Sequence, residues 1–317
     1  MLFSACETDF DVNAEWEETT VVFGLLDASD ENQLQKIKIS KAFLGNMDAY
    51  QMAQYSDSIN YGVDELDVKI YKWDFNQIED SVELIAVPTY RDGEIFYDSI
   101  IVYQFDNVNS FLQKGYEYEL VVKNNKSGNL VSSRTEIVTG FDFDNIFTTK
   151  SKSFQFGLYT NNDFSSSTIT WDDSNDNGKI YQLDLIFHYT EIMDGVYTED
   201  SLIYSLPLID DTESKMKIEG NSFFNFLALN LDKNQSVIRY FNEIDMIMTV
   251  GSEDLETYIN VNKPITGIVQ ERPQFTNINN GIGLFSSRFK KIRIDYDLTS
   301  STLDYLKSVE GLDRNFQ

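Results

Sequence analysis

The chain has 317 residues, and its 52 aspartates and glutamates outnumber its 25 lysines and arginines, which gives a formal net charge of −27 at pH 7. Such a field repels nucleic acid and anionic lipid headgroups, so nucleic-acid binding is excluded as a function. A hydrophobic content of 42% with 14% aromatic residues is too high for a disordered acidic chain. The acidity is typical of a protein with a basic partner or a bound cation, or of a well-solvated surface.

The N-terminal segment is dominated by Cys6, the only cysteine. It ends the sequence LFSAC at residues 2–6, which has the small residues of a bacterial lipoprotein cleavage site. A complete leader has a basic start and an apolar core of ~7–15 residues, and five residues precede Cys6 here. We therefore expect lipidation of Cys6 within a lipobox remnant and acidic tether at residues 1–18; the alternative is a thiol without a role. The sequence contains no run of ~18 apolar residues, so it predicts no membrane-spanning helix.

Residues 19–140 show the period-two alternation of half-buried strands, as at 66–73 and 116–122. Asp92-Gly93 and the segment 124–128 between such runs favour hairpin turns. This pattern predicts an immunoglobulin-like or fibronectin-like β-sandwich. Residues 47–56 and 107–114 are interpreted as short helices.

Residues 141–317 begin a second alternating pattern, which predicts a second β-rich domain. Its main strands are expected at 180–190, 246–250 and 292–296, with a hairpin turn at Asp194-Gly195. A helix is predicted from Asn221 or Ser222 onward. The sequence from Ser301 to Asp304 resembles a capping box for a short C-terminal helix.

A calcium loop is one interpretation of residues 173–184. Asp173, Asn175, Asn177 and Asp184 have the spacing of oxygen ligands in a calcium-binding loop, and a glycine follows at position 178. However, the last ligand is Asp where such loops have Glu, and strand alternation follows where a helix is expected. A polar hairpin turn explains the same residues, so a calcium site and a turn both remain open.

His188 is the only histidine and is predicted to lie on one face of the strand 180–190. It could act as a general base, but no serine or cysteine motif for nucleophilic catalysis accompanies it. We therefore expect a histidine on a β surface. The lack of further histidine or cysteine also excludes an ordinary zinc site.

The segment 273–288 is rich in glycine, asparagine and apolar residues. This composition predicts a loop packed onto the body of the second domain. Thr276, Asn277, Asn280 and Phe285 are its candidate contacts with a partner.

Four features resemble a Bacteroidota lipoprotein family of unknown function: Cys6 in its lipobox-like context, the strand 21–26, the strand 115–120 before a glycine-containing hairpin, and the segment 276–285. The resemblance covers most of the chain and implies an outer-membrane or cell-surface lipoprotein, often encoded near TonB-dependent receptors. Glu7, Asp9 and Asp11 are similar to the signal that directs such lipoproteins to the outer face. The family offers no catalytic residues to carry over.

These observations predict a non-enzymatic, lipid-anchored accessory or ligand-binding protein that works beside an envelope partner such as a TonB-dependent barrel. A surface protein that binds or processes glycans is the first alternative, because 18 tyrosines and 23 phenylalanines could supply stacking platforms. A structural envelope protein is the second alternative. No cofactor is expected apart from the calcium ion considered above.

Overall fold

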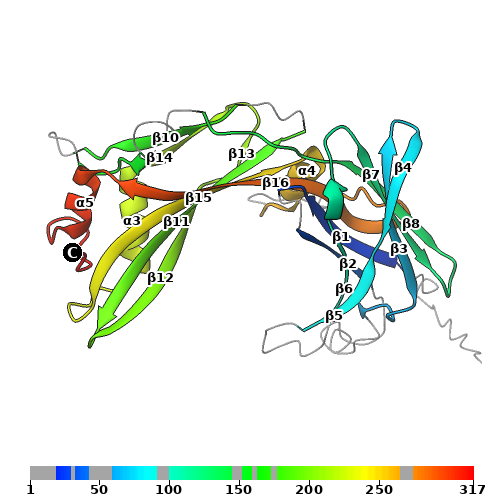
Figure 1. Cartoon of the computed structure of the whole chain (residues 1–317), viewed down its shortest axis with the longest axis horizontal. Coiled ribbons are helices and arrows are strands. Elements are labelled where there is room, and N and C mark those ends of the chain that lie inside the picture. Colours follow the sequence, from blue (N-terminus) through cyan, green and yellow to red (C-terminus); the bar gives the residue numbers. More distant parts are fainter. Residues whose placement is uncertain are drawn as a thin grey trace, which may run out of the picture.

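The computed structural model describes residues 19–29, 33–42, 59–90, 100–144, 152–158, 163–172, 177–264 and 274–317. The tether with Cys6, the predicted helix at 47–56 and the Asp92-Gly93 turn lie outside these residues. The described residues form a mostly β protein with several sheets, which confirms the predicted class. Figure 1 shows two lobes joined into an arch.

A large sheet runs through both lobes. Eight of its ten strands follow the order β12 (Val196–Ser205), β11 (Ile180–Met193), β15 (Ile238–Gly251), β16 (Gly281–Leu298), β1 (Thr19–Asp27), β2 (Leu34–Ala42), β6 (Ile100–Asp106), β5 (Ile85–Thr89). The other two are β13 (Ile209–Asp210), which pairs with β11, and β9 (Ser153–Phe154), which pairs with β16.

Two smaller sheets and the helices pack against this large sheet. A four-stranded sheet has the order β4 (Gln77–Glu83), β3 (Leu66–Asp74), β7 (Glu117–Asn124), β8 (Leu130–Glu136), and a two-stranded sheet joins β10 (Ser166–Thr170) to β14 (Lys215–Glu219). The helices whose bounds fall within the described residues are η1, a single 3-10 turn (Val108–Ser110), α3 (Gly220–Asn230), α4 (Glu253–Asn262) and α5 (Ser300–Lys307).

The first lobe holds its core between the four-stranded sheet and strands β1, β2 and β6 of the large sheet. Alternate residues of each strand point into this core, among them Val22, Ile37 and Ile39 from one sheet and Val68 and Leu120 from the other. The intervening side chains point outward, because successive residues of a strand face opposite sides of its sheet. The predicted hairpin between β7 and β8 is confirmed.

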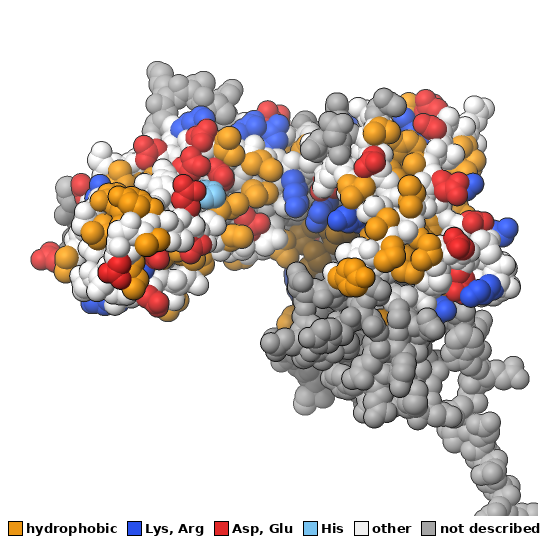
Figure 2. Space-filling model, turned by 60° about the horizontal axis from the view of Figure 1, so that its bottom comes forward, with side chains coloured by type: hydrophobic (Ala, Val, Ile, Leu, Met, Phe, Trp, Pro, Cys, Tyr) orange, Lys and Arg blue, Asp and Glu red, His pale blue; other side chains and the backbone are white. Residues whose placement is uncertain are grey.

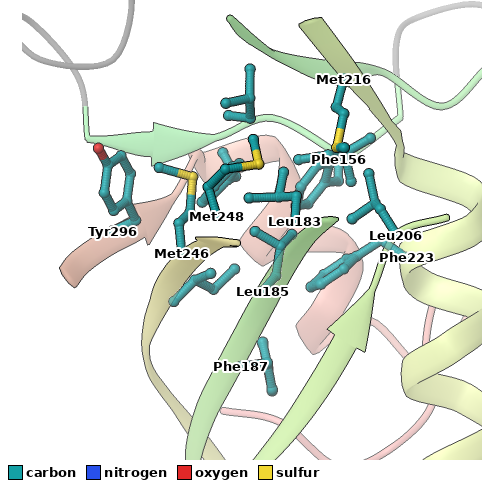
Figure 3. Packing of buried hydrophobic residues seen from close by; sticks show 14 of the residues in the cluster. Phe156, Leu183, Leu185, Phe187, Leu206, Met216, Phe223, Met246, Met248 and Tyr296 are labelled. Carbon is teal, nitrogen blue, oxygen red and sulfur yellow. The ribbon is translucent and has the colours of Figure 1, made fainter. Parts of the chain in front are cut away.

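The second lobe packs one face of β11 and β15 against helices and the two-stranded sheet. Figure 3 shows Leu183, Leu185 and Phe187 of β11 gathered with Met246 of β15 and Phe223 of α3. Each of these five side chains is fully buried. The tight turn predicted between β11 and β12 is present, since Asp194 and Gly195 both have positive φ and the flanking residues pair across it.

Strand β16 joins the two lobes, as Figure 1 shows in orange. Its residues 281–288 pair in parallel with β1, and its later residues pair with β15. Phe285 lies in the first core, whereas Tyr296 and Leu298 lie in the second. The C-terminal half of the chain therefore completes the sheet of the first lobe.

The predicted loop at 273–288 is wrong from Gly281 onward, because β16 begins there. Leu284, Phe285, Ser286 and Ser287 are all buried, so neither face of this part of the strand is solvated. A strand covered on both faces shows no alternation between polar and apolar residues. The segment therefore lacked the signal on which the other strands were predicted.

The predicted helices differ from the observed ones at their ends. Helix α3 begins at Gly220, directly after β14, and no side chain caps it. The predicted helix at 107–114 is one 3-10 turn, because the Oδ1 atom of Asn107 and the hydroxyl of Tyr118 bond the backbone that follows it. The C-terminal helix is confirmed as α5. Helix α4 was not predicted.

Candidate functional site

Two polar cavities lie where the lobes meet, and we call them the junction cavities. The larger, about 270 Å³, is lined by residues that include Glu136, Asn177, Lys179, Ser252, Glu253 and Asp254. The smaller, about 170 Å³, is lined by residues that include Lys114, Tyr116, Glu117, Glu136, Thr139 and Asn177. Both cavities share Glu136, at the end of β8, and Asn177, shortly before β11.

Two adjacent serines of β16 hold the walls of the larger cavity together. The Ser286 hydroxyl lies 2.5 Å from the hydroxyl of Ser252, the residue before α4. The Ser287 hydroxyl donates to the Glu136 carbonyl at 2.6 Å and accepts from the Val138 N–H at 2.9 Å. Neighbouring residues of a strand point to opposite faces, so one strand fixes α4 on one side and the end of β8 on the other.

The junction cavities are predominantly acidic. Glu253 and Asp254 lie in the first turn of α4, where the helix dipole stabilises negative charge. Lys179 adds a positive charge to the larger cavity, where its Nζ atom lies 2.7 Å from Asp211, and Lys114 adds one to the smaller cavity. The cavities thus present carboxylates and an amide that accept hydrogen bonds from hydroxyl or ammonium groups.

The predicted calcium ligands are only partly described. Asp173 and Asn175 lie outside the described residues. Asn177 lines the junction cavities, and its side chain donates to the Ile137 carbonyl at 3.4 Å. Asp184 lies inside β11, where Oδ1 is buried and has no hydrogen-bond partner among the described residues.

Asn177 and Asp184 lie toward different parts of the sheet. Ile180 pairs with Gly251, next to the cavity, whereas Asp184 pairs with Ile247. Four residues of extended strand separate Ile180 from Asp184 by about 13 Å. The structure does not bring these two side chains together, and calcium binding by the segment 173–184 stays a prediction.

The four predicted partner contacts have structural roles in the first lobe. The Asn277 side chain brackets Phe285, since its Oδ1 atom accepts from the Phe285 N–H at 2.9 Å and its Nδ2 atom donates to the Phe285 carbonyl at 2.7 Å. The Phe285 ring is fully buried. Asn280 has a positive φ and donates to the Leu130 carbonyl, and the Thr276 hydroxyl accepts from the Ile278 N–H. A contact of this segment with a partner stays a prediction.

The two segments singled out in the sequence nevertheless approach the same place. Asn277 donates a second hydrogen bond, 2.8 Å long, to Asp254, which lines the larger cavity together with Asn177. Sequence reasoning missed Glu136, Glu253 and Asp254. Ser252 followed by Glu253 and Asp254 is a helix-start signal that could have identified α4.

His188 lies away from the junction cavities, on the face of β11 opposite the second core. Its Nε2 atom is 3.1 Å from Oδ2 of Asp245 on the neighbouring strand. It lines neither junction cavity.

Comparison of the chain with protein-family models and with curated proteins found no match. None of the described helices is both long enough and apolar enough to span a lipid bilayer.

Proposed function

We propose that this protein is a non-enzymatic, ligand-binding lipoprotein of the outer membrane or cell surface. It is attached through lipid on Cys6 and works beside an envelope partner such as a TonB-dependent transporter. The observation that supports ligand binding is the pair of acidic junction cavities. Cys6 in its lipobox-like context supports the attachment.

The lining of the junction cavities favours a small polar ligand. Glu136, Glu253 and Asp254 converge from β8 and α4, and Asn177 adds an amide. Carboxylates accept several hydrogen bonds each, so they suit a ligand rich in hydroxyl or ammonium groups. Because the walls come from both lobes, a ligand here would contact residues of both.

The finer architecture is also part of this proposal: an immunoglobulin-like sandwich at 19–140 followed by a second β-rich domain at 141–317. The four-stranded sheet and strands β1, β2 and β6 sharing one core support the sandwich. The pairing of β1 with β16 adds a strand from the second unit to it.

A glycan-binding protein is the alternative that one observation favours. The smaller cavity combines the Tyr116 ring with Glu117 and Glu136. Aromatic rings beside hydrogen-bonding groups suit sugars, which have apolar faces and hydroxyl edges. The Lys72 ammonium lies over one face of the Tyr116 ring, 4.0 Å from its centre, so a sugar would stack on the other face.

Thermal unfolding of the full chain with a panel of sugars, polysaccharides and small amines tests the proposed site. A ligand of the junction cavities should raise the Tm of the wild type and of Glu83→Gln, which replaces an exposed carboxylate on β4 that lines neither cavity. It should raise the Tm of Glu136→Gln much less. Sugar hits that Tyr116→Leu abolishes would favour the glycan-binding alternative.

Two results would contradict the proposal. Ligands that stabilise Glu136→Gln as strongly as the wild type would place binding outside the junction cavities. Turnover of a ligand that a single carboxylate substitution abolishes would make the protein an enzyme.

A further inference from the structure

Four polar side chains from three strands meet on the face of β11, β15 and β16 that points away from the second core, which we call the open face. They are His188, Glu243, Asp245 and Asp295. Figure 2 shows the histidine, in pale blue, at the surface of the second lobe beside acidic side chains in red. His188 is 32% exposed and Asp245 is 18% exposed.

Strand register explains why these residues meet. His188 pairs directly with Glu243, so their side chains share one face and are neighbours across the strands. Asp245 is two residues further along β15 and therefore lies on the same face, diagonal to His188. The strand register is irregular beside this cluster. The pairing of β11 with β15 shifts between His188 and Tyr189, and the pairing of β15 with β16 shifts between Ile244 and Met246.

The second register shift brings Asp295 to the cluster. Asp245 faces an extra residue of β16 there, and Asp295 has a φ of 64°. Such bulges redirect a side chain out of the regular alternation. The Asp295 backbone N–H donates to Oδ1 of Asp245 at 3.2 Å, which leaves Oδ2 facing His188.

The ligand atoms of His188, Glu243 and Asp245 all lie within 4.8 Å of one another. Two atoms bonded at ~2.1 Å to one tetrahedral ion are ~3.4 Å apart. The most distant pair of ligand atoms would therefore need to close by up to ~1.4 Å to share an ion, which a change of side-chain rotamer can supply. The bond from the Asp295 N–H would orient Asp245, as outer-shell groups orient metal ligands.

Among the described residues, no lysine or arginine forms an ion pair with Glu243, Asp245 or Asp295, whereas His188 lies 3.1 Å from Asp245. The Asp295 carboxyl lies within hydrogen-bonding reach of the Glu243 carboxyl. Converging carboxylates with an imidazole among them distinguish this cluster from a merely acidic surface patch.

We propose that His188, Glu243 and Asp245 bind a divalent transition-metal ion on the open face, with Asp295 supplying a further carboxylate. An imidazole ligand favours transition metals over Mg²⁺ and Ca²⁺, which take oxygen ligands. Zn²⁺ should bind more tightly than Mn²⁺, following the usual order of affinities for such sites. This site is separate from the junction cavities and does not depend on the function proposed for them.

The single histidine makes the test unambiguous. We would label the histidine ring of the full chain, purified without a polyhistidine tag, and follow its NMR signal during titration with Zn²⁺ and with Mg²⁺. The proposal predicts a saturable change with one equivalent of Zn²⁺ and little change with Mg²⁺. Glu243→Gln and Asp245→Asn should each weaken Zn²⁺ binding at least ~10-fold, because each removes one ligand but keeps the side-chain shape.

Glu83→Gln is the matched control, because it removes one exposed carboxylate in the other lobe. It should leave Zn²⁺ affinity unchanged. The site would be overturned if the His188 ring signal did not respond to Zn²⁺ or drifted without saturating. It would also be overturned if Glu243→Gln and Asp245→Asn bound Zn²⁺ as tightly as the wild type. Calorimetric heat without a response of the His188 ring would do the same, since the ion would then bind elsewhere.

Discussion

Asn277 shows how a residue that sequence analysis assigns to a partner can serve the fold. Its amide holds the Phe285 backbone with two hydrogen bonds and reaches Asp254 with a third. Asn277→Asp would remove the donors and place a second carboxylate beside Asp254. We expect this variant to lose ~1–3 kcal/mol of unfolding free energy, measured by chemical denaturation.

Asn280→Asp is the control for that prediction. Asn280 is exposed, aspartate tolerates its positive φ, and the one hydrogen bond that the change removes, to the Leu130 carbonyl, is exposed to solvent. We expect a loss well under ~1 kcal/mol. Equal losses of unfolding free energy in both variants would show that the hydrogen bonds between Asn277 and the Phe285 backbone add no stability of their own.

Glu65 connects three segments of the first lobe and should make stability depend on pH. Burial alone would raise the pKa of its carboxyl, but the Gly62 N–H and the charges of Lys126 and Lys41 outweigh burial. The pKa therefore lies below its ordinary value of 4.5. The stability from Glu65 is present above pH 4.5 and is lost as the pH falls through the lowered pKa.

Glu65→Gln tests this assignment. It should cost ~1–3 kcal/mol at pH 7, because a charged hydrogen-bond acceptor for Lys126 and Gly62 is lost. The difference from wild type should shrink when denaturation is repeated below pH 4. A difference that stays constant between pH 7 and pH 3 would rule out the charge of Glu65 as its cause.

At the scale of elements, β16 depends on the close approach of its backbone to β1. Gly283 has a φ of 120°, and a Cβ atom there would lie 1.9 Å from the Val22 carbonyl oxygen. Gly283→Ala should therefore cost about 3 kcal/mol or more. Gly128→Ala, in the turn between β7 and β8, meets no atom within 4 Å and should cost only ~1–2 kcal/mol of backbone strain.

Denaturation of the two glycine variants measures the difference directly. If Gly283→Ala does not fold well enough for a denaturation curve, its soluble yield is measured instead. A low yield for Gly283→Ala and a normal yield for Gly128→Ala would also show that the change at Gly283 is the more destabilising one. Similar stability of both variants would mean that β1 and β16 do not approach as closely as described.

The elements that the sequence could predict are those with one solvated face. Strands such as β3, β7 and β11 alternate between buried and at least partly exposed residues, and the tight turn at 194–195 has the residues that positive φ requires. The first part of β16 could not be predicted in this way, because it is buried on both faces. Its pairing with β1, more than 250 residues away, leaves no local pattern.

The candidate sites were harder to predict for the same reason. The sequence predicts His188 on a β surface, but its neighbours Glu243, Asp245 and Asp295 come from other strands, and their approach depends on two shifts of register. The residues around the junction cavities likewise come from the start of β7, from β8, from α4 and from the segment before β11. Only Asn177 among them was singled out from the sequence.

At the scale of the whole molecule, the arch should unfold as one unit. Ile278 and Phe285 complete the first core, and β16 shields one edge of β1. A fragment of residues 19–144 would lack both, so we expect it to fold poorly, with little dispersion of its amide NMR signals. A dispersed spectrum and a sharp unfolding transition for that fragment would show that the first lobe folds without β16.

The proposed function as a whole is tested by purifying the full-length, C-terminally tagged protein from detergent-solubilised envelopes of the organism that encodes it. Mass spectrometry would then identify the N-terminal peptide and the proteins that remain bound. We expect acylated Cys6 as the first residue and a stoichiometric partner such as a TonB-dependent barrel. An unmodified Cys6 in a protein recovered alone would contradict it.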